Sequence, residues 1–408
     1  MGDDVLRGGV VSESFGQEVA ARELASLFSE ELSGTVARER SEFDRLMAGV
    51  DRLVLFGAGN LGRETLACLR NDGVAPVAFS DNRRDTWGRT VDGIPVLAPA
   101  DAARLVGSTG AFLVTIWNDR HRFAETAQQL RALGCPNVFA SPTLRWKYQG
   151  RIPQFPFFFL DLPSRLYGAR EEVLRAANVW ADDESRREYV AQIRLRMLGD
   201  LETLPPPVPD QYAPSDLFDP SEDEVFVDCG AFDGDTIRDF VAAWDGRFKS
   251  AYALEPDPAT FSRLVETVNQ LPQSIGARIT PVQAGVAERS ERVSFRADGT
   301  MGAAIAADGD VTIMCHALDD LFDRECVTYV KMDIEGFEPA ALQGSLQLVD
   351  RCRPILAVCA YHAQGHVWSI PLFLHEQLSD YSLFLRPHKP DGWDLIVYAV
   401  PHERRLKA

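Results

Sequence analysis

A short apolar run that leads directly into a glycine-rich turn constrains the fold of this chain more than any other feature. Residues 224–236 have the sequence EVFVDCGAFDGDT. The apolar residues 225–227 predict a buried strand, and Asp228 is expected at its carboxyl end. Gly230 and Gly234 follow, and without a Cβ atom they let the backbone approach a ligand closely. The run predicts a strand, a turn and a helix that together grip a nucleotide-like cofactor.

The spacing of this turn indicates which cofactor it holds. It reads D-x-G-x-x-x-G, whereas a turn that grips the pyrophosphate of a dinucleotide reads G-x-G-x-x-G. An enzyme that binds the nucleoside and amino-acid parts of S-adenosylmethionine (SAM) fits this spacing better.

Acidic residues follow the next predicted strand, residues 250–254. Glu255 lies 25 residues after Gly230, and a carboxylate at that strand end can accept hydrogen bonds from both ribose hydroxyls of a nucleoside. Asp257 is expected to border the same cofactor site. The alternative is that a strand-end acid caps the helix that begins near Pro258, because Asp and Glu are common at helix starts.

Two further strands bring catalytic candidates to the same edge. Residues 328–332 lead to Asp333 and Glu335, and residues 354–360 lead to His362. In a doubly wound sheet the carboxyl ends of the strands line the ligand pocket, and acids there would attract a cationic sulfonium. His362 is the leading candidate for a general base, since the unperturbed pKa of histidine is about 6.5. Asp333 is the runner-up base or the partner that orients the imidazole.

A metal ion is the weaker interpretation of these acids. Oxygen ligands suit Mg²⁺, so Asp333 and Glu335 are conceivable ligands. Two acids only two residues apart are poor evidence for a metal site, however, and we expect none.

Ordered motifs extend through residues 216–401: VDCGAFDGDT, ALEPDP, KMDIEGFEPAALQG, RPILAVCAYH, and the closing pair FLRPH and LIVYAV. Together they resemble the FkbM-type SAM-dependent methyltransferases. The resemblance implies an α/β fold with the seven-stranded sheet of class I methyltransferases, whose last strand is antiparallel, and methylation of a hydroxyl, commonly on a saccharide or polyketide. It implies that SAM is held by Asp228, Gly230, Gly234 and Glu255, and that the reacting centre is bordered by Asp333, Glu335 and His362.

A second glycine-rich turn lies upstream and has the true dinucleotide spacing. After a short apolar strand, Gly57, Gly59 and Gly62 form G-x-G-x-x-G before a predicted helix. Asp81 lies 24 residues after Gly57, close to the about 20 residues expected for a ribose-binding acid. With a third strand at residues 111–116 the pattern is one Rossmann-like half. The chain is therefore expected to contain two Rossmann-like, doubly wound sheets.

The upstream unit has a resemblance of its own. Residues 51–143, which include DGIPVLAPAD, are similar to the small N-terminal domain of PglD-type sugar-nucleotide acyltransferases, which binds a nucleotide sugar. The hexapeptide repeats of those acyltransferases are absent from the sequence, so acyl transfer is not implied. Three interpretations stay open: a site that recruits a nucleotide-linked sugar or lipid, an NAD(P) site, and a scaffold without a ligand. Trp117, beyond the third strand, would either stack on a base or pack in the core.

The length of 408 residues exceeds one hydrophobic core and suggests several units. Residues 1–50 are expected to form helices that pack or form a homodimer, ahead of the nucleotide-binding domain at 51–150. Residues 151–215 are expected to be a helical connector that ends in a stiff proline-rich linker at 205–214. The methyltransferase domain is expected at residues 216–408.

Composition limits the kinds of substrate the protein can bind and the compartment in which we expect it. The net charge of −18 argues against nucleic-acid substrates, because neutralisation of phosphates dominates such affinity. No apolar run reaches the about 18 residues of a membrane span, and the run at 155–162 is expected to pack between domains. The acidic start of the chain is unlike a signal peptide, and the seven cysteines without C-x-x-C spacing are expected to be reduced. We expect a cytoplasmic protein.

These observations lead to one predicted function and two alternatives. We expect a SAM-dependent O-methyltransferase that acts on a sugar, glycan or related natural-product intermediate in polysaccharide biosynthesis, while the N-terminal unit recruits the nucleotide-bearing or lipid-bearing end of the acceptor. One alternative is a non-catalytic protein that binds nucleotide sugars or serves as a scaffold. The other is an NAD-dependent oxidoreductase that acts through the N-terminal domain.

Overall fold

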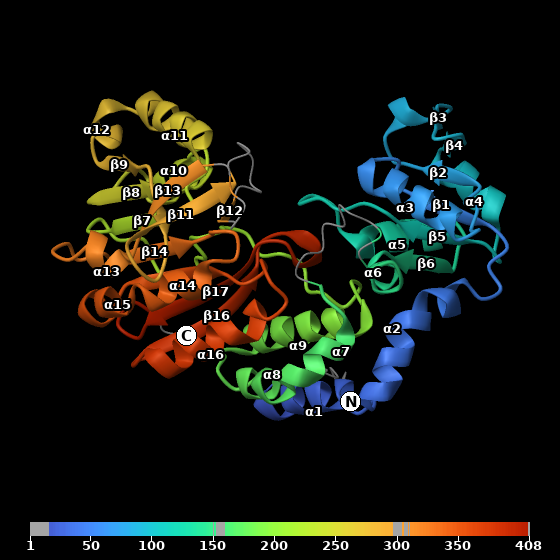
Figure 1. Ribbon diagram of the computed structural model, residues 1–408, viewed down its shortest axis with the longest axis horizontal. Coiled ribbons are helices and arrows are strands. Elements are labelled where there is room, and N and C mark those ends of the chain that lie inside the picture. The colour runs from blue at the N-terminus through green and yellow to red at the C-terminus, as the bar shows by residue number, and fades with distance from the viewer. Residues whose placement is uncertain are drawn as a thin grey trace, which may run out of the picture.

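Two α/β lobes make up the protein, and a group of helices joins them (Figure 1). The computed structural model describes residues 16–149, 151, 160–296, 304–305, 309 and 311–406. The N-terminal lobe, coloured blue to teal in Figure 1, stands apart from the larger yellow-to-red C-terminal lobe. The joining helices run along the lower side of that view.

The N-terminal lobe is built on a six-stranded sheet. Its strands are β1 (Leu53–Phe56), β2 (Ala78–Ser80), β3 (Thr90–Val91), β4 (Ile94–Leu97), β5 (Ala111–Val114) and β6 (Asn137–Ala140). They lie in the order β3-β4-β2-β1-β5-β6, and only the β3–β4 edge pair is antiparallel. The helices of the lobe are α3 (Asn60–Asn71), α4 (Pro99–Val106), α5 (Phe123–Ala132) and α6 (Pro142–Lys147). The three predicted strands are present, and β3, β4 and β6 extend the sheet beyond the predicted half.

The C-terminal lobe contains the predicted seven-stranded sheet. Its strands are β7 (Val225–Cys229), β8 (Ser250–Leu254), β9 (Ile279–Val282), β14 (Tyr329–Met332), β15 (Ile355–Cys359), β16 (Tyr381–Pro387) and β17 (Leu395–Pro401). The order is β16-β17-β15-β14-β7-β8-β9, and the last strand, β17, is antiparallel to both neighbours. The helices are α10 (Asp235–Ala243), α11 (Pro258–Gln270), α12 (Gln273–Gly276), α13 (Leu318–Leu321), α14 (Glu338–Gln343), α15 (Leu346–Cys352) and α16 (His366–Gln377).

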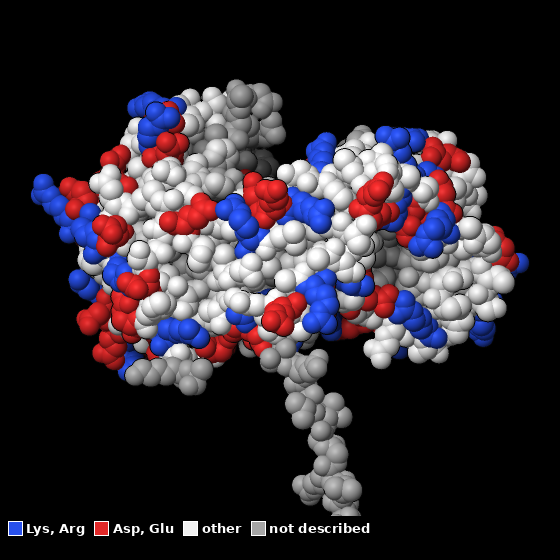
Figure 2. Space-filling model, turned by 90° about the horizontal axis from the view of Figure 1, so that it is seen from below, with Lys and Arg blue, Asp and Glu red and all other residues white. Residues whose placement is uncertain are grey.

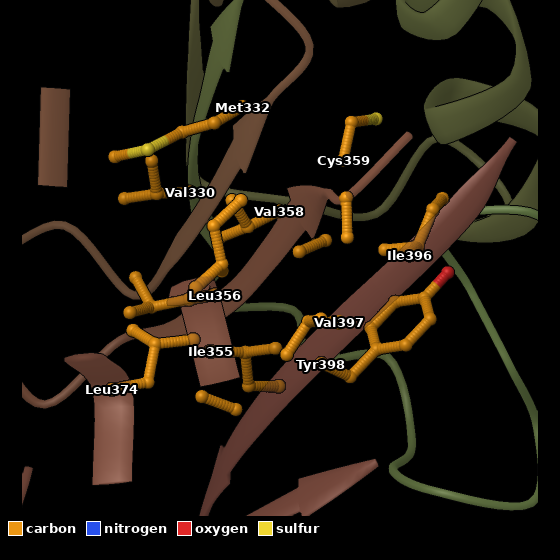
Figure 3. Close-up of a cluster of buried hydrophobic side chains, with 14 of the residues drawn as sticks. Val330, Met332, Ile355, Leu356, Val358, Cys359, Leu374, Ile396, Val397 and Tyr398 are labelled. Atoms are coloured by element: carbon orange, nitrogen blue, oxygen red, sulfur yellow. The ribbon is translucent and has the colours of Figure 1, made fainter. Parts of the chain in front are cut away.

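The strands at the centre of this sheet are apolar on both faces because helices cover both. Figure 3 shows side chains of β14, β15 and β17 in the resulting core, including Val330, Leu356 and Val397, each fully buried. Such near-continuous apolar runs are typical of parallel sheets that are covered on both faces. The apolar run RPILAVC, from which the sequence analysis predicted a strand, forms β15.

A four-stranded sheet beside the large one was not predicted. Its strands are β10 (Gly285–Val286), β11 (Glu291–Arg296), β12 (Ala304–Ile305) and β13 (Val311–His316). Alternate residues of β11 and β13, among them Phe295, Ile313 and Cys315, form a small buried cluster. The alternation of apolar and polar residues along β11 and β13 was the signal for this sheet in the sequence.

The joining helices belong to the hydrophobic cores of both lobes. They are α1 (Gln17–Leu27), α2 (Leu32–Met47), α7 (Pro163–Leu166), α8 (Arg170–Ala176) and α9 (Asp183–Leu198). Leu24 of α1 and Tyr189 of α9 are buried in the C-terminal core, whereas Phe43 of α2 is buried in the N-terminal core. Asp182 caps α9 by accepting a hydrogen bond from the Ser185 amide. Most of the apolar run 155–162 lies outside the described residues.

The proline-rich stretch at residues 205–214 forms no helix or strand, but it is not a free linker. The Val208 amide donates to the Pro387 carbonyl at 2.8 Å, and the Tyr212 amide donates to the Tyr398 hydroxyl at 3.0 Å. Tyr212 itself is buried. These contacts hold the stretch against the β16–β17 hairpin, so it forms part of the C-terminal lobe.

The two lobes meet where the β16–β17 turn contacts the loop between β5 and α5. The ring centroids of Trp117 and Trp393 lie 5.1 Å apart, so Trp117 packs on a second tryptophan. Asp391 accepts a hydrogen bond from the Phe123 amide, and its Oδ2 lies 3.6 Å from His121 Nδ1. Both segments lie at the carboxyl edges of their sheets, so this contact brings the two edges together.

Charged side chains of both signs are interspersed on the face shown in Figure 2, where basic residues form no continuous patch. Among the described residues, no helix combines the length and the apolar character that a membrane crossing requires.

Arg386 of β16 ties the joining helices to the C-terminal sheet. Its guanidinium is 2 % exposed and lies 2.6 Å from Asp182 Oδ2 and 2.7 Å from Asp216 Oδ2. It also donates to the Ser185 hydroxyl at 2.9 Å. One buried cation thus joins the start of α9, the segment before β7 and the terminal hairpin.

We predict that Arg386→Met lowers the free energy of unfolding by about 3 kcal/mol, the lower end of the range for removing one partner of a buried ion pair. We expect the lower end of this range because the Asp216 side chain is half exposed, so water can solvate its charge when the guanidinium is removed. Urea unfolding followed by tryptophan fluorescence measures the effect. The control is Arg131→Met, which breaks an exposed pair with Glu202 and should cost less than about 1 kcal/mol. Equal losses in the two variants would contradict the assigned role of Arg386.

Candidate functional site

The strand order of the C-terminal sheet reverses between β7 and β14, and the glycine-rich turn lies at this point. Gly230 has φ +81°, and a Cβ atom there would lie 1.9 Å from the Asp333 carbonyl oxygen. At Gly234, with φ +87°, it would lie 2.9 Å from Thr267 Cγ2. The chain's own packing therefore requires both glycines, in addition to any need for ligand approach.

Asp228 lies inside β7, not beyond its end. It is fully buried, and it is opposite Lys331 in the parallel pairing with β14. Its Oδ1 lies 2.8 Å from Lys331 Nζ, and both side chains are at most 2 % exposed. The expectation of Asp228 at the strand end is corrected here, because the hydrogen-bonded ladder continues through Cys229 and places the carboxylate in the core.

Lys331 was missed by the sequence analysis, although a lone lysine in an apolar strand is a signal. Burial alone would lower the pKa of Lys331, but the Asp228 and Asp333 carboxylates outweigh it and raise the pKa above its usual value. The ammonium also donates to the Gly230 carbonyl at 2.6 Å. It therefore fixes the turn through its backbone as well as neutralising Asp228.

Glu255 lies directly after β8 and faces the same turn. Its Oε2 accepts a hydrogen bond from the Phe232 amide at 3.0 Å, and its Oε1 accepts one from the Asp257 amide at 2.8 Å. Burial raises the pKa of Glu255 to about 7, and the two amide donors offset only part of this effect. Each oxygen retains a lone pair, so the carboxylate can accept further hydrogen bonds from a ligand.

Asp257 caps α11. It is 1 % exposed, and its Oδ1 accepts from the amides of Ala259 and Thr260 at 2.8 and 2.9 Å. The sequence analysis offered a helix cap as the alternative role for an acid after β8. Asp257 has that role, whereas Glu255 faces the glycine turn.

The predicted catalytic residues Asp333, Glu335 and His362 come together at the ends of β14 and β15. His362 Nε2 lies 3.3 Å from Asp333 Oδ1 and 3.7 Å from Glu335 Oε2. On the other side of the ring, Nδ1 lies 2.8 Å from Oε1 of Glu338, the first residue of α14. Glu338 was not singled out from the sequence, and its side chain is completely buried. One imidazole is thus surrounded by three carboxylates, and one candidate ligand atom each from Asp333, Glu338 and His362 lies within 4.8 Å of the other two.

The charges in this cluster shift one another's proton affinities. Burial alone would lower the pKa of His362, but Glu338 and Asp333 outweigh it and raise the pKa well above its usual value. Burial raises the pKa of Glu335 to about 7, partly offset by His362. The pKa of Asp333 is lowered despite its burial, because His362 and Lys331 stabilise the carboxylate. The surrounding carboxylates therefore favour the protonated form of His362.

Two tyrosines complete the surroundings of Asp333. The Tyr212 hydroxyl donates to Oδ2 at 3.1 Å, and the Tyr361 hydroxyl donates to Oδ1 at 3.3 Å. Tyr361 was not singled out from the sequence, and Tyr212 lies in the stretch expected to be a linker. Neither contact has a signal in the local sequence, because each depends on how distant segments cross the sheet.

The N-terminal turn repeats this geometry at its own reversal point, between β1 and β5. A Cβ at Gly57 would lie 2.9 Å from the Thr115 carbonyl oxygen, and one at Gly62 would lie 2.0 Å from the Gly57 carbonyl oxygen. At Gly59, whose φ is −81°, it would meet nothing within 4 Å. Packing explains two of these glycines, whereas Gly59 faces open space that a ligand can occupy.

Asp81 follows β2, as Glu255 follows β8. Its Oδ2 accepts from the Ala58 amide of the glycine turn at 3.3 Å. The carboxylate also pairs with Arg83, and although burial alone would raise the pKa of Asp81, these hydrogen bonds outweigh it and lower the pKa. In this structure Asp81 therefore steadies the turn and the loop that follows β2.

Comparisons with known proteins agree with this description of the C-terminal lobe. The family model described as "Methyltransferase FkbM domain" matches residues 228–383. Among solved structures, Methyltransferase FkbM from Methylobacillus flagellatus KT matches with a TM-score of 0.72 and 22% sequence identity, covering 95% of this chain and 100% of that one. At this identity the likeness shows the fold, which the two proteins share over both lobes. A search of curated proteins found no match.

Two other solved structures match more weakly. UDP-D-quinovosamine 4-dehydrogenase from Vibrio fischeri has 21% identity over 22% of this chain and 77% of that chain, with a TM-score of 0.20. Fibrillarin from Aeropyrum pernix, solved with natively bound S-adenosyl-L-methionine, has 13% identity over 44% of this chain and 67% of that chain, with a TM-score of 0.30. These scores are too low to support an argument about either lobe.

The fold and the family match agree on the C-terminal lobe. The C-terminal lobe has a methyltransferase fold, with a parallel-dominated seven-stranded sheet and an antiparallel last strand. More specifically, residues 228–383 match the family model described as "Methyltransferase FkbM domain". The resemblance of residues 51–143 to PglD-type domains stays a prediction.

We predict that Lys331→Met lowers the free energy of unfolding by about 3–5 kcal/mol, because it leaves Asp228 as an uncompensated buried charge. The double variant Asp228→Asn, Lys331→Met should recover most of this loss, since it removes both charges. Urea unfolding of the two single variants and the double variant measures the coupling. A double variant that is less stable than Lys331→Met would argue against the ion pair as the dominant interaction.

Proposed function

We propose that the protein is a SAM-dependent O-methyltransferase that acts on a hydroxyl of a sugar, glycan or related intermediate. The observation that carries the proposal is the arrangement around the glycine turn. Glu255 borders the turn on the β8 side, and the cluster of Asp333 and His362 borders it on the β14 side. The FkbM domain match supports methyl transfer as the reaction.

The residues of the turn suit SAM. Among the described residues, the hydrogen bonds to Glu255 come from two backbone amides, so both of its oxygens can also accept hydrogen bonds from ribose hydroxyls. The acids around His362 outnumber the nearby cations and favour a positively charged ligand. When bound, SAM would supply a methyl group on a cationic sulfur.

The reaction needs alignment and the removal of one proton. The acceptor's hydroxyl oxygen forms the new bond to the methyl carbon, while the bond from that carbon to sulfur breaks and leaves its electron pair on sulfur. The hydroxyl proton passes to a base. General-base help is worth about 10²–10⁴-fold in rate, and positioning adds several kcal/mol.

His362 can act as the expected general base only when its ring is not protonated. A protonated imidazole has no lone pair with which to accept a proton, and the carboxylates around His362 favour that form by raising its pKa. Activation of the acceptor therefore requires that this proton be displaced, or that another group acidify the hydroxyl. Asp333 and Glu335 remain the predicted catalytic partners of His362.

The N-terminal unit is proposed to recruit the nucleotide-bearing end of the acceptor. The open space at Gly59 supports a ligand at that turn. The contact of the β5–α5 loop with the β16–β17 turn supports an acceptor that reaches from one carboxyl edge to the other. A non-catalytic binding protein and an NAD-dependent oxidoreductase are the alternatives that the experiments below separate.

Calorimetric titration with S-adenosylhomocysteine is expected to give one site per chain. Glu255→Gln should weaken this binding about tenfold or more, because a hydrogen bond to a charged group contributes about 1 kcal/mol more than a neutral one. Loss of the site in this variant would support the proposed cofactor contact. Absence of binding in the parent protein, with nucleotides still bound, would favour the two alternatives.

The same titration should depend on pH. Since the pKa of Glu255 is about 7, its ionised fraction falls as the pH decreases from about 8 to about 6. Affinity should therefore decrease over this range in the parent protein, by up to about tenfold, and change little in Glu255→Gln. The charged neighbours of Glu255 are Asp257 and Lys331, and both are present in the variant.

Transfer of labelled methyl groups from SAM should be faster to nucleotide-linked sugars than to the same sugars without the nucleotide. Gly59→Val is expected to raise KM for the nucleotide-linked acceptor at least about tenfold without lowering thermal stability, since a side chain there meets only open space. Gly62→Ala is the contrasting variant and should destabilise the lobe. An unchanged KM in Gly59→Val would remove this turn from acceptor binding.

A further inference from the structure

Two of the seven cysteines lie beside each other near the amino ends of β14 and β15. Cys326 lies in the loop before β14 and is exposed, and Cys352 is the last residue of α15 and is partly exposed. The other five cysteines are buried. A thiol reacts where a reagent can reach it, so this pair is where cysteine chemistry is accessible in the folded chain.

The parallel pairing of β14 with β15 brings the two cysteines together. Tyr329 pairs with Ile355, and Cys326 and Cys352 each lie three residues before these partners. The Ile355 amide also donates to the Thr328 carbonyl at 2.9 Å, so the two segments run side by side as they enter the sheet. Neighbouring strands are about 4.8 Å apart, which is within the Cα separation of about 4.4–6.8 Å that a disulfide spans.

Hydrogen bonds hold the two cysteines in this arrangement. The Cys352 thiol donates at 3.8 Å to the carbonyl of Glu325, the residue before Cys326. Arg351 Nη2 donates to the same carbonyl at 3.3 Å. The two thiols are close enough to share a hydrogen bond. Little further ordering is therefore needed to bring one sulfur onto the other, and such positioning speeds a reaction between two groups.

We propose that Cys326 and Cys352 form a reversible disulfide, and that the oxidant is a low-molecular-weight disulfide of the glutathione type. Cys326 reacts first because it is the more exposed of the two. The sequence analysis expected all seven cysteines to be reduced, so the geometry adds an oxidised state for this pair. The inference concerns the amino edge of the sheet and does not depend on the proposed function.

The exchange takes two steps that balance. The Cys326 thiolate attacks one sulfur of the small disulfide, whose S–S bond breaks and releases a thiolate with the electron pair. Cys352 then loses its proton and attacks the Cys326 sulfur, which forms the protein disulfide and releases the second small thiolate. The released thiolates take up the two protons that the cysteines lose. The protein is thereby oxidised by two electrons, and the small disulfide is reduced by two.

The bond closes residues 326–352 into a loop. This segment contains Lys331, Asp333 and Glu338, so the disulfide ties the strand and the turn that carry these residues to the end of α15. A disulfide restricts the unfolded chain and thereby stabilises the folded one. We therefore expect the oxidised protein to unfold at a higher temperature than the reduced protein.

The test incubates the reduced, full-length protein with oxidised glutathione and follows intact mass and the number of free thiols after denaturation. A pH of about 8.5 is used because burial and Cys352 raise the pKa of Cys326, and Arg351 and Lys249 offset this only in part. The parent protein should lose two thiols per chain, retain no glutathione, and regain both thiols with dithiothreitol. Accumulation of glutathione on Cys326, or no loss of thiols, would overturn the proposal.

Single variants separate the two steps. Cys352→Ser should stop the reaction at the mixed disulfide, with one glutathione bound to Cys326. Cys326→Ser should react at least about tenfold more slowly than the parent, because the remaining thiol is less exposed. The matched control is Cys135→Ser, which removes a buried thiol and should oxidise as the parent does, since its hydroxyl can donate to the Ala103 carbonyl in place of the thiol. Equal retention of glutathione in the parent and in Cys352→Ser would mean that Cys352 does not reach Cys326, and the proposal fails.

Thermal unfolding gives a second measurement. Oxidation should raise the Tm of the parent by at least about 5 °C. The rise should be absent in Cys352→Ser, which has no second thiol at this position. A disulfide-linked dimer on a non-reducing gel would place the bond between two chains and would also overturn the proposal.

Discussion

The buried ammonium of Lys331 is the interaction on which the C-terminal site depends. It lies at the point where the strand order reverses, pairs with Asp228 on the central strand, and holds the Gly230 carbonyl of the cofactor turn. Its charge also helps to keep Asp333 ionised. Because the ammonium is nearly inaccessible to water, these interactions are stronger than they would be at the surface. The shape of the turn and the charge of the neighbouring cluster therefore have a common origin.

The glycine-rich turns of the two lobes are held by the same kinds of contact. In each, a glycine at the end of the central strand lies against the carbonyl of the residue after the neighbouring strand: Gly57 against Thr115, and Gly230 against Asp333. In each, an acid after the second strand accepts a hydrogen bond from an amide of the glycine turn, namely Asp81 or Glu255. The lobes then differ in what faces the turn, since only the C-terminal one has a histidine among carboxylates.

Much of the fold follows from local patterns. The strand predicted at residues 250–254 is β8, and the convergence of Asp333 with His362 at one edge of the sheet was also predicted. These features depend on periodicity and on the rule that strand ends share an edge. The role of Glu338 was not predictable in this way, because it requires α14 to place its first residue behind the His362 ring. The contact of Tyr212 with Asp333 was not predictable for a similar reason, because Tyr212 lies in a stretch whose prolines suggested a linker.

The sequence by itself determined the strands, the positions of the glycine turns and the acids at the strand ends, because these depend on backbone sterics and on the spacing of apolar residues. Only the tertiary structure decided which charges meet. Asp228 pairs with Lys331 across the sheet, Glu338 orients His362, and the turn that carries Trp393 joins the N-terminal lobe. Electrostatic interactions depend on distance and burial, and neither is fixed until distant segments have packed together.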